Sequence, residues 1–259
     1  MGFTEAQLSA WLASYFWPFI RIGAMMAAAP IFSARHINMR FRLLLAVVVT
    51  LAAAPLLPKM PVVDAFSHEA FLIIVHQIGI GVMMGFTIQL VFGALIYGGQ
   101  VLAYSMGLGF ASMVDPLNGL QVPVVAQFYL IIATLLFLIV NGHLILIQMV
   151  VDSFQTLPVA VDGVTRNSLW DLVSWGSRMF AGGLLIALPV VASLLMVNIG
   201  MGVVTRAAPQ FNIFAVGFPM TMTLGFIIIW LSLPNMMGAF QSVLEEAFDL
   251  VATYVNITP

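Results

Sequence analysis

The longest apolar stretch of this sequence, residues 70–114, contains no Asp, Glu, Lys or Arg. One continuous α-helix over it would extend about 68 Å, roughly twice the hydrocarbon thickness of a membrane. We therefore expect the chain to break within this stretch. The sequence GLGF at residues 107–110 favours the break, because glycine adopts backbone conformations that are closed to other residues.

Charged residues divide the rest of the chain, and the whole pattern predicts six apolar helical segments arranged as three hairpins. The segments are expected at about 10–34, 43–58, 70 to the GLGF break, 116–151, 179–199 and 211–233. Residues 152–178 are expected to form the most polar connection. A short link that contains Arg206 is expected at the tip of the last hairpin.

Composition decides the solvent in which these segments fold. Hydrophobic residues make up 62% of the chain and charged residues 7%, whereas soluble domains carry roughly 25% charged residues. The sequence therefore predicts an all-α integral membrane protein. A net charge of −2 gives no basic surface for nucleic acid, and the absence of cysteine excludes thiol chemistry. No basic residue precedes the first apolar segment, so we expect residues 1–30 to be retained rather than cleaved as a signal peptide.

Three arginines give the orientation. Arg35, Arg40 and Arg42 crowd the first connection, and no acid lies between Glu5 and Asp64. Basic loops stay in the cytoplasm, so this pattern places the first connection and the Arg206 link on the cytoplasmic side. With six segments, both termini would then lie outside.

Small residues and prolines indicate close contact between helices. Gly81 and Gly85 stand four residues apart, a spacing that lets two backbones approach in lipid. Freed backbone groups next to Pro and Gly need protein neighbours at membrane depth. Ordinary helix packing would account for the glycines, but the number of prolines in or beside apolar runs favours a protein that is surrounded by other subunits. These prolines are Pro18, Pro30, Pro123, Pro189, Pro219 and Pro234.

Catalytic and metal-binding patterns are missing from the sequence. The four histidines, at 36, 68, 76 and 143, form no zinc-binding pair at helical spacing, and no phosphate-binding loop or nucleophile elbow is present. We expect no enzyme activity, no metal and no cofactor. Arg21, inside an apolar run, has two interpretations: a residue that snorkels or is paired near the membrane interface, or a contact with another subunit.

The segment that follows the long apolar run has an unusual composition for a loop. It combines flexible Met, permissive Gly and bulky apolar residues with a single charge, and could form a deformable hydrophobic seal. A buried re-entrant turn without a gating role is the alternative, and Asp-Pro alone favours a simple turn. We call residues 106–116 the plug segment: Met106, Gly107, Leu108, Gly109, Phe110, Ala111, Ser112, Met113, Val114, Asp115 and Pro116.

Several of these stretches resemble one family of proteins. GLGFASMVDPLNG (107–119), VPVVAQF and NGH, together with APIFSARHINMRFRLLLA near the start and RAAPQFNIFAVGFPMT at 206–221, are similar to the FliR family of flagellar export-gate proteins. The similarity covers almost the whole chain. The 107–119 and 206–221 stretches are specific, whereas the apolar runs between them are not.

The resemblance implies a role in an assembly. FliR-like proteins combine with FliP and FliQ into a helical cone at the core of the type III export apparatus, with its helices held largely above the membrane plane. FlhB is expected at the cytoplasmic mouth, where Arg206 would contact a partner, and FlhA beneath it. Residues 1–178 would be FliP-like and 179–259 FliQ-like. The pore plug of the family falls on about 106–121, where it would yield to unfolded export substrates.

Three other interpretations stay open from the sequence. The injectisome relative of FliR shares the architecture, although the two specific stretches favour the flagellar branch. A small-solute or ion transporter would show inverted internal repeats, and we find no clear repeat. A structural scaffold could seed the cone without gating it.

Overall fold

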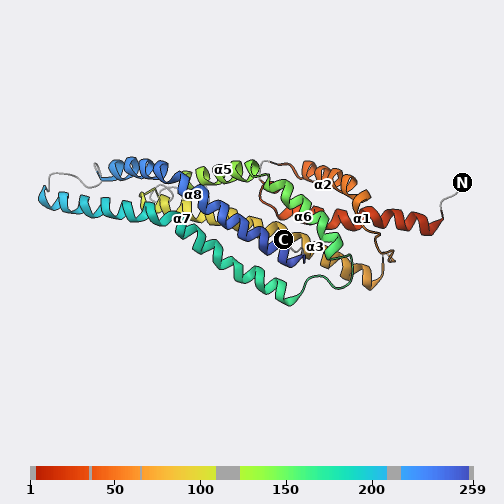
Figure 1. Cartoon of the computed structure of the whole chain (residues 1–259). Coiled ribbons are helices and arrows are strands. Elements are labelled where there is room, and N and C mark those ends of the chain that lie inside the picture. Colours follow the sequence, from red (N-terminus) through yellow and green to blue (C-terminus); the bar gives the residue numbers. More distant parts are fainter. Residues whose placement is uncertain (1–3, 35–36, 65, 109–122, 209–216, 257–259) are drawn as a thin grey trace. The chain divides into compact units, whose positions relative to one another are not determined.

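The computed structural model describes residues 4–34, 37–64, 66–108, 123–208 and 217–256, and all the regular structure in these ranges is helical (Figure 1). This confirms the all-helical class. The elements are α1 (Glu5–Ala28), α2 (Met39–Ala53), the short 3₁₀ helix η1 (Ala54–Leu56), α3 (His68–Ser105), α5 (Val124–Ile139), α6 (Gly142–Thr156), α7 (Arg166–Ala207) and α8 (Phe218–Tyr254).

Local sequence explains where several helices begin and end. Thr4 and Gln7 form a reciprocal capping box at the start of α1, and the side chain of Asn38 accepts the Arg40 backbone N–H at the start of α2. Pro55 lies in the first turn of η1, where a missing N–H costs nothing. Asn141 separates α5 from α6 with a left-handed φ of 55°, a conformation that Asn tolerates better than most residues.

Fewer helices could cross a membrane than the six predicted segments. Within the described ranges four stretches are long and apolar enough, and α5 with α6 would add a fifth if the pair counts as one broken span. Helix α1 is not among them; it carries Ser9, Ser14 and Arg21, which lower its hydropathy. The four stretches are Met39–Leu56, His68–Ser105, Arg166–Ala207 and Phe218–Tyr254.

Several predicted boundaries were wrong. Within the described residues, the single segment expected at 116–151 is two helices, α5 and α6, which bend by 61° at the break between them. Most of the expected polar connection at 152–178 is helical, because α6 continues to Thr156 and α7 already begins at Arg166. The last predicted segment, 211–233, stops too early, since α8 runs through Pro234 to Tyr254. Charges were taken as helix breaks, but a helix accepts charged residues on any face that meets water.

The end of α8 has such a two-sided pattern. Its acidic residues, Glu245, Glu246 and Asp249, are exposed, whereas Ala247 and Val251 are fully buried. This spacing is that of one apolar helix stripe. This end of α8 is therefore solvated on one side and packed on the other.

The chain forms two compact units, each made of separate stretches of sequence. Unit 1 comprises Met1–Leu90, Phe137–Trp175 and Leu244–Pro259; unit 2 comprises Val91–Leu136 and Gly176–Val243. The predicted division at residues 178 and 179 concerns likeness to other subunits and stays a prediction.

Unit 1 depends on a close crossing of α1 and α3. A Cβ on Gly81 would overlap the Arg21 carbonyl oxygen, and a Cβ on Gly85 would lie 2.5 Å from the carbonyl oxygen of Met25. The two glycines are four residues apart and so share one face of α3. The predicted role of these glycines in close helix packing is confirmed.

Unit 2 uses the same principle. A Cβ on Gly98 of α3 would lie 2.8 Å from the Gly183 carbonyl oxygen of α7, and one on Gly99 would lie 2.6 Å from the Ala126 Cα of α5. Phe92 packs edge-on against Phe240 of α8, with 6.1 Å between the ring centroids. Glycines thus bring three helices to backbone contact, and aromatic rings fill the wider gaps.

We expect the substitution Gly85→Ala to destabilise the protein, because the added methyl group must push apart the backbones of α1 and α3. Overpacking of this kind costs about 1–3 kcal/mol. The heat resistance of detergent-extracted protein, followed by size-exclusion chromatography, measures the effect. Gly23→Ala on α1 is the matched control, because a Cβ there meets no atom within 4 Å. Equal heat resistance of the two variants would contradict this account of the crossing.

Candidate functional site

Arg21 lies at the centre of a buried polar cluster in unit 1. Its Nε donates a hydrogen bond to the Gln77 Oε1 of α3 at 2.8 Å. Its Nη1 donates to the carbonyl oxygen and the hydroxyl of Ser153 in α6, at 3.0 and 2.8 Å, and its Nη2 to the Leu157 carbonyl oxygen at 2.9 Å. One fully buried side chain therefore joins three helices.

Among the described residues Arg21 bonds to amide, hydroxyl and carbonyl oxygens rather than to a carboxylate, so these and other groups must stabilise its charge. The Ser153 and Leu157 carbonyl groups belong to the C-terminal end of α6, which carries the negative end of the helix dipole. The Phe154 ring lies 4.0 Å from the guanidinium carbon, a distance at which an aromatic face attracts a cation. Arg21 belongs to α1, which is not one of the candidate membrane spans. Burial lowers the pKa of Arg21, but the side chain stays protonated at neutral pH.

The structure bears on only one of the two interpretations of Arg21. The side chain is paired inside its own subunit, which the sequence offered as one possibility. A single chain does not test the predicted contact with another subunit, and that contact stays a prediction. Gln77 and Ser153 were missed because both lie more than 50 positions away from Arg21, and nothing in the sequence around them indicates which residue they meet.

The plug segment begins where α3 ends, in unit 2. Gly107 has a φ of 79°, its N–H donates to the Tyr104 carbonyl oxygen, and the Leu108 N–H donates to the Ala103 carbonyl oxygen. This pair of hydrogen bonds is the Schellman motif, in which a left-handed glycine ends a helix. The predicted break at GLGF is confirmed at its first glycine.

Only Met106, Gly107 and Leu108 of the plug segment belong to the described residues, and we call them the plug stem. Residues 109–116 lie outside the described ranges. The Met106 side chain is buried and lies against Gly225 of α8, while Gly107 faces the Phe218 ring of the same helix.

The chain after the plug segment also meets α8. The first turns of α5 and the middle of α8 enclose an apolar groove of about 200 Å³ in unit 2. Tyr129 and Ala126 of α5 are fully buried, so the helix is held from its first turn. The groove is lined by Val124, Val125, Phe128, Phe226, Ile229, Trp230 and Leu233.

Arg206 is exposed in the last turn of α7, near the expected hairpin tip. A cation at this end of a helix interacts favourably with the dipole, so its position needs no partner to be stable. The predicted contact of Arg206 with a cytoplasmic partner stays a prediction.

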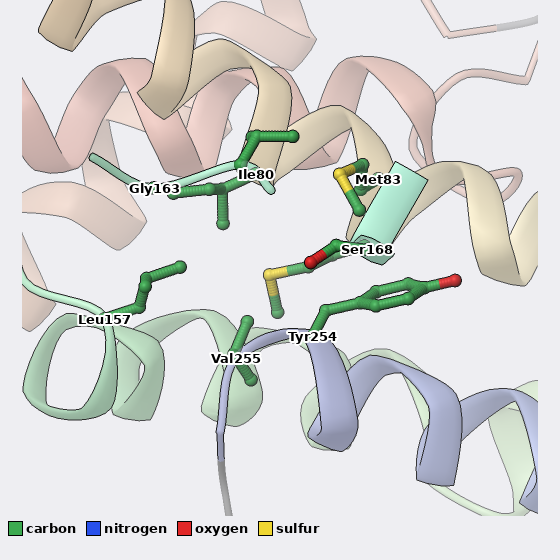
Figure 2. Close-up of a pocket in the computed structure, with 9 residues that line it drawn as sticks. Ile80, Met83, Leu157, Gly163, Ser168, Tyr254 and Val255 are labelled. Carbon is green, nitrogen blue, oxygen red and sulfur yellow. The ribbon is translucent and has the colours of Figure 1, made fainter. Parts of the chain in front are cut away.

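A small cavity in unit 1 shows how tightly the end of α8 is packed. Figure 2 shows Tyr254, the last residue of α8, and the following Val255 on one side of the cavity, with Ile80 and Met83 of α3 on the other. The cavity holds about 10 Å³, which is room for about one water molecule. Nearby, the Val164 N–H donates to the His76 Nδ1 at 3.0 Å and ties the α6–α7 connection to α3. This cavity is part of the packing rather than a ligand site.

Four or five apolar helices of the described residues are long enough to cross a membrane, which defines the class as an α-helical membrane protein. Residues 12–247 match the protein family described as "Bacterial export proteins, family 1", and the chain belongs to this family.

Curated relatives carry a common name. The flagellar biosynthetic protein FliR of Escherichia coli (strain K12) is 40% identical over 99% of this chain and 98% of its own length. The FliR of Pectobacterium carotovorum subsp. carotovorum is 39% identical over 97% and 96%, and that of Bacillus subtilis (strain 168) is 29% identical over 82% of each. The predicted membership of the FliR family is confirmed, and the protein is a membrane-embedded component of the flagellar export apparatus.

We expect Arg21→Met to destabilise the protein strongly, because it leaves the Ser153 and Leu157 carbonyl groups and the Gln77 amide oxygen without their donor. Each unsatisfied buried group costs about 1–3 kcal/mol. Arg21→Lys should rescue little, since one ammonium cannot reproduce the planar guanidinium geometry. Heat resistance in detergent measures both variants, and Arg40→Met, at an exposed arginine of unit 1, is the control. If Arg21→Met were as stable as Arg40→Met, the cluster would not hold the helices together.

Proposed function

We propose that this protein is a core subunit of the flagellar type III export gate and that its plug segment closes a protein-conducting channel. In this proposal it assembles with FliP and FliQ in the bacterial inner membrane, within the flagellar basal body. FlhB and FlhA lie at the cytoplasmic side, and unfolded flagellar substrates pass through the channel. The export-apparatus family and the likeness to the FliR relatives support this assignment.

One observation carries the gating part of the proposal. The plug segment has one charged residue, Asp115, and both the plug stem and the first turns of α5 are packed in unit 2 against the same helix, α8. A segment of mostly apolar residues suits a seal, because hydrophobic constrictions exclude water and ions. Its methionines and glycines allow the same seal to deform around a passing chain.

Deleting residues 107–114 should loosen the seal, so that cells expressing the assembled complex leak ions or a small dye. The companion variant Gly109→Asp should lower motility and export while the complex still assembles, because an unpaired carboxylate in an apolar seal is strongly unfavourable. Gly109→Ser adds a small uncharged side chain, so comparing it with Gly109→Asp shows how much of the effect is due to the charge. Dye influx per assembled complex and secreted flagellin are the measurements.

The outcomes separate a gate from a scaffold. A structural turn predicts failed assembly for both the deletion and Gly109→Asp. A deletion complex that forms, exports normally and is as impermeable as the wild type would show that the plug segment is not the seal.

Arg206→Glu should impair export without preventing assembly of the core complex, because it reverses the charge of an exposed site proposed to meet a cytoplasmic partner such as FlhB. Arg206→Lys retains the charge and should retain most of the export. Photo-crosslinkers at the neighbouring Ala207, also exposed, should capture that partner. Capture of periplasmic proteins alone would mean that the topology is inverted.

A further inference from the structure

We propose that Gly225 of α8 is a positioning residue of the gate: it forms the notch that seats Met106 and thereby fixes the plug stem. This inference rests on the proposed gating role of the plug segment. It goes beyond that role by assigning the control of the closed state to a different helix.

The contact between the two residues leaves no spare room. A Cβ on Gly225 would lie 2.8 Å from both the Cγ and the Cε of Met106, and 3.1 Å from its sulfur. The Met106 side chain is 1% exposed. The space that the Met106 side chain fills exists only because residue 225 is a glycine and has no side chain. A Cβ at residue 225 would clash with Cγ as well as Cε of Met106, and rotating the terminal methyl group cannot move Cγ.

A second contact fixes the direction of the stem. A Cβ on Gly107 would lie 3.2 Å from the Phe218 ring, and the left-handed φ of Gly107 already disfavours any side chain there. Phe218 and Gly225 are seven residues apart, which places them two turns from each other on one face of α8. The plug stem is thus held at two successive levels of the same helix.

The neighbouring face of α8 meets the first turns of α5, where the described chain resumes after residue 122. The α8 residues that line the groove with α5 recur at i, i+3, i+4 and i+7, the pattern of one helical stripe; they are Phe226, Ile229, Trp230 and Leu233. One helix therefore contacts the described chain before residue 109 and after residue 122, so that displacing the notch would shift the plug stem against a fixed helix.

The test is a size exchange across the contact. Gly225→Val should force Met106 out of its notch and raise dye influx per assembled complex severalfold. Adding Met106→Ala to Gly225→Val should return influx toward the wild-type level, because the lost side chain vacates the space that valine needs. Gly238→Val, on the same helix where a Cβ meets nothing within 4 Å, carries the same cost in helix propensity and should remain impermeable.

Each result decides between the notch and a merely structural contact. Loss of assembly in Gly225→Val that Met106→Ala does not restore, or equal influx in Gly225→Val and Gly238→Val, would overturn the proposal. Recovery of a tight, assembled complex in the double variant supports it, even if Gly225→Val alone assembles poorly. If the complex with residues 107–114 deleted leaks dye but the Gly225→Val complex does not, the notch is rejected and the sealing role of the plug segment is retained. A tight deletion complex would reject the proposed function itself.

Discussion

The contact between α1 and α3 is the constraint on which unit 1 depends. Gln77, Gly81 and Gly85 follow one another at intervals of four and so form a single face of α3. On α1, the Arg21 guanidinium bonds to Gln77, while the backbone of Arg21 and Met25 lies against the glycines. The hydrogen bond depends on the close approach of the two helices, because a side chain at Gly81 would push them apart.

A buried cation is costly in an apolar protein, and its surroundings explain how this one is accommodated. Desolvating an ion costs several kcal/mol unless other groups replace its water. The end of α6 supplies carbonyl oxygens and Phe154 supplies an aromatic face. Arg21 thereby links the first helix to residues more than 130 positions later. In unit 2 the contact between Met106 and Gly225 is apolar, and none of the described residues of the plug segment, 106–108, is charged.

The sequence predicted those features that depend on local pattern. Apolar length and composition identified the membrane class, the Gly81–Gly85 spacing identified a close crossing, and Gly107 marked the end of α3. The partners of Arg21 were not predictable, because the sequence around Gln77 and Ser153 looks the same whether or not these side chains are paired. The start of α7 was missed because Arg166 and Asp171 were interpreted as loop residues, although a helix that emerges from an apolar environment carries such residues. The contact of Gly225 with Met106 was not predictable either, because the two residues are distant in sequence.

Site-specific crosslinking from the plug stem to a substrate in transit tests the central claim most directly. A flagellar substrate fused to a folded domain that cannot pass should stall in the channel, and a photo-crosslinker at Leu108 should then capture the unfolded part of that substrate. The same crosslinker at Phe66, which is almost fully exposed in unit 1, should not. If the stalled complex is intact and Leu108 captures no substrate, the exported chain does not pass the plug segment, and the protein is not the gate.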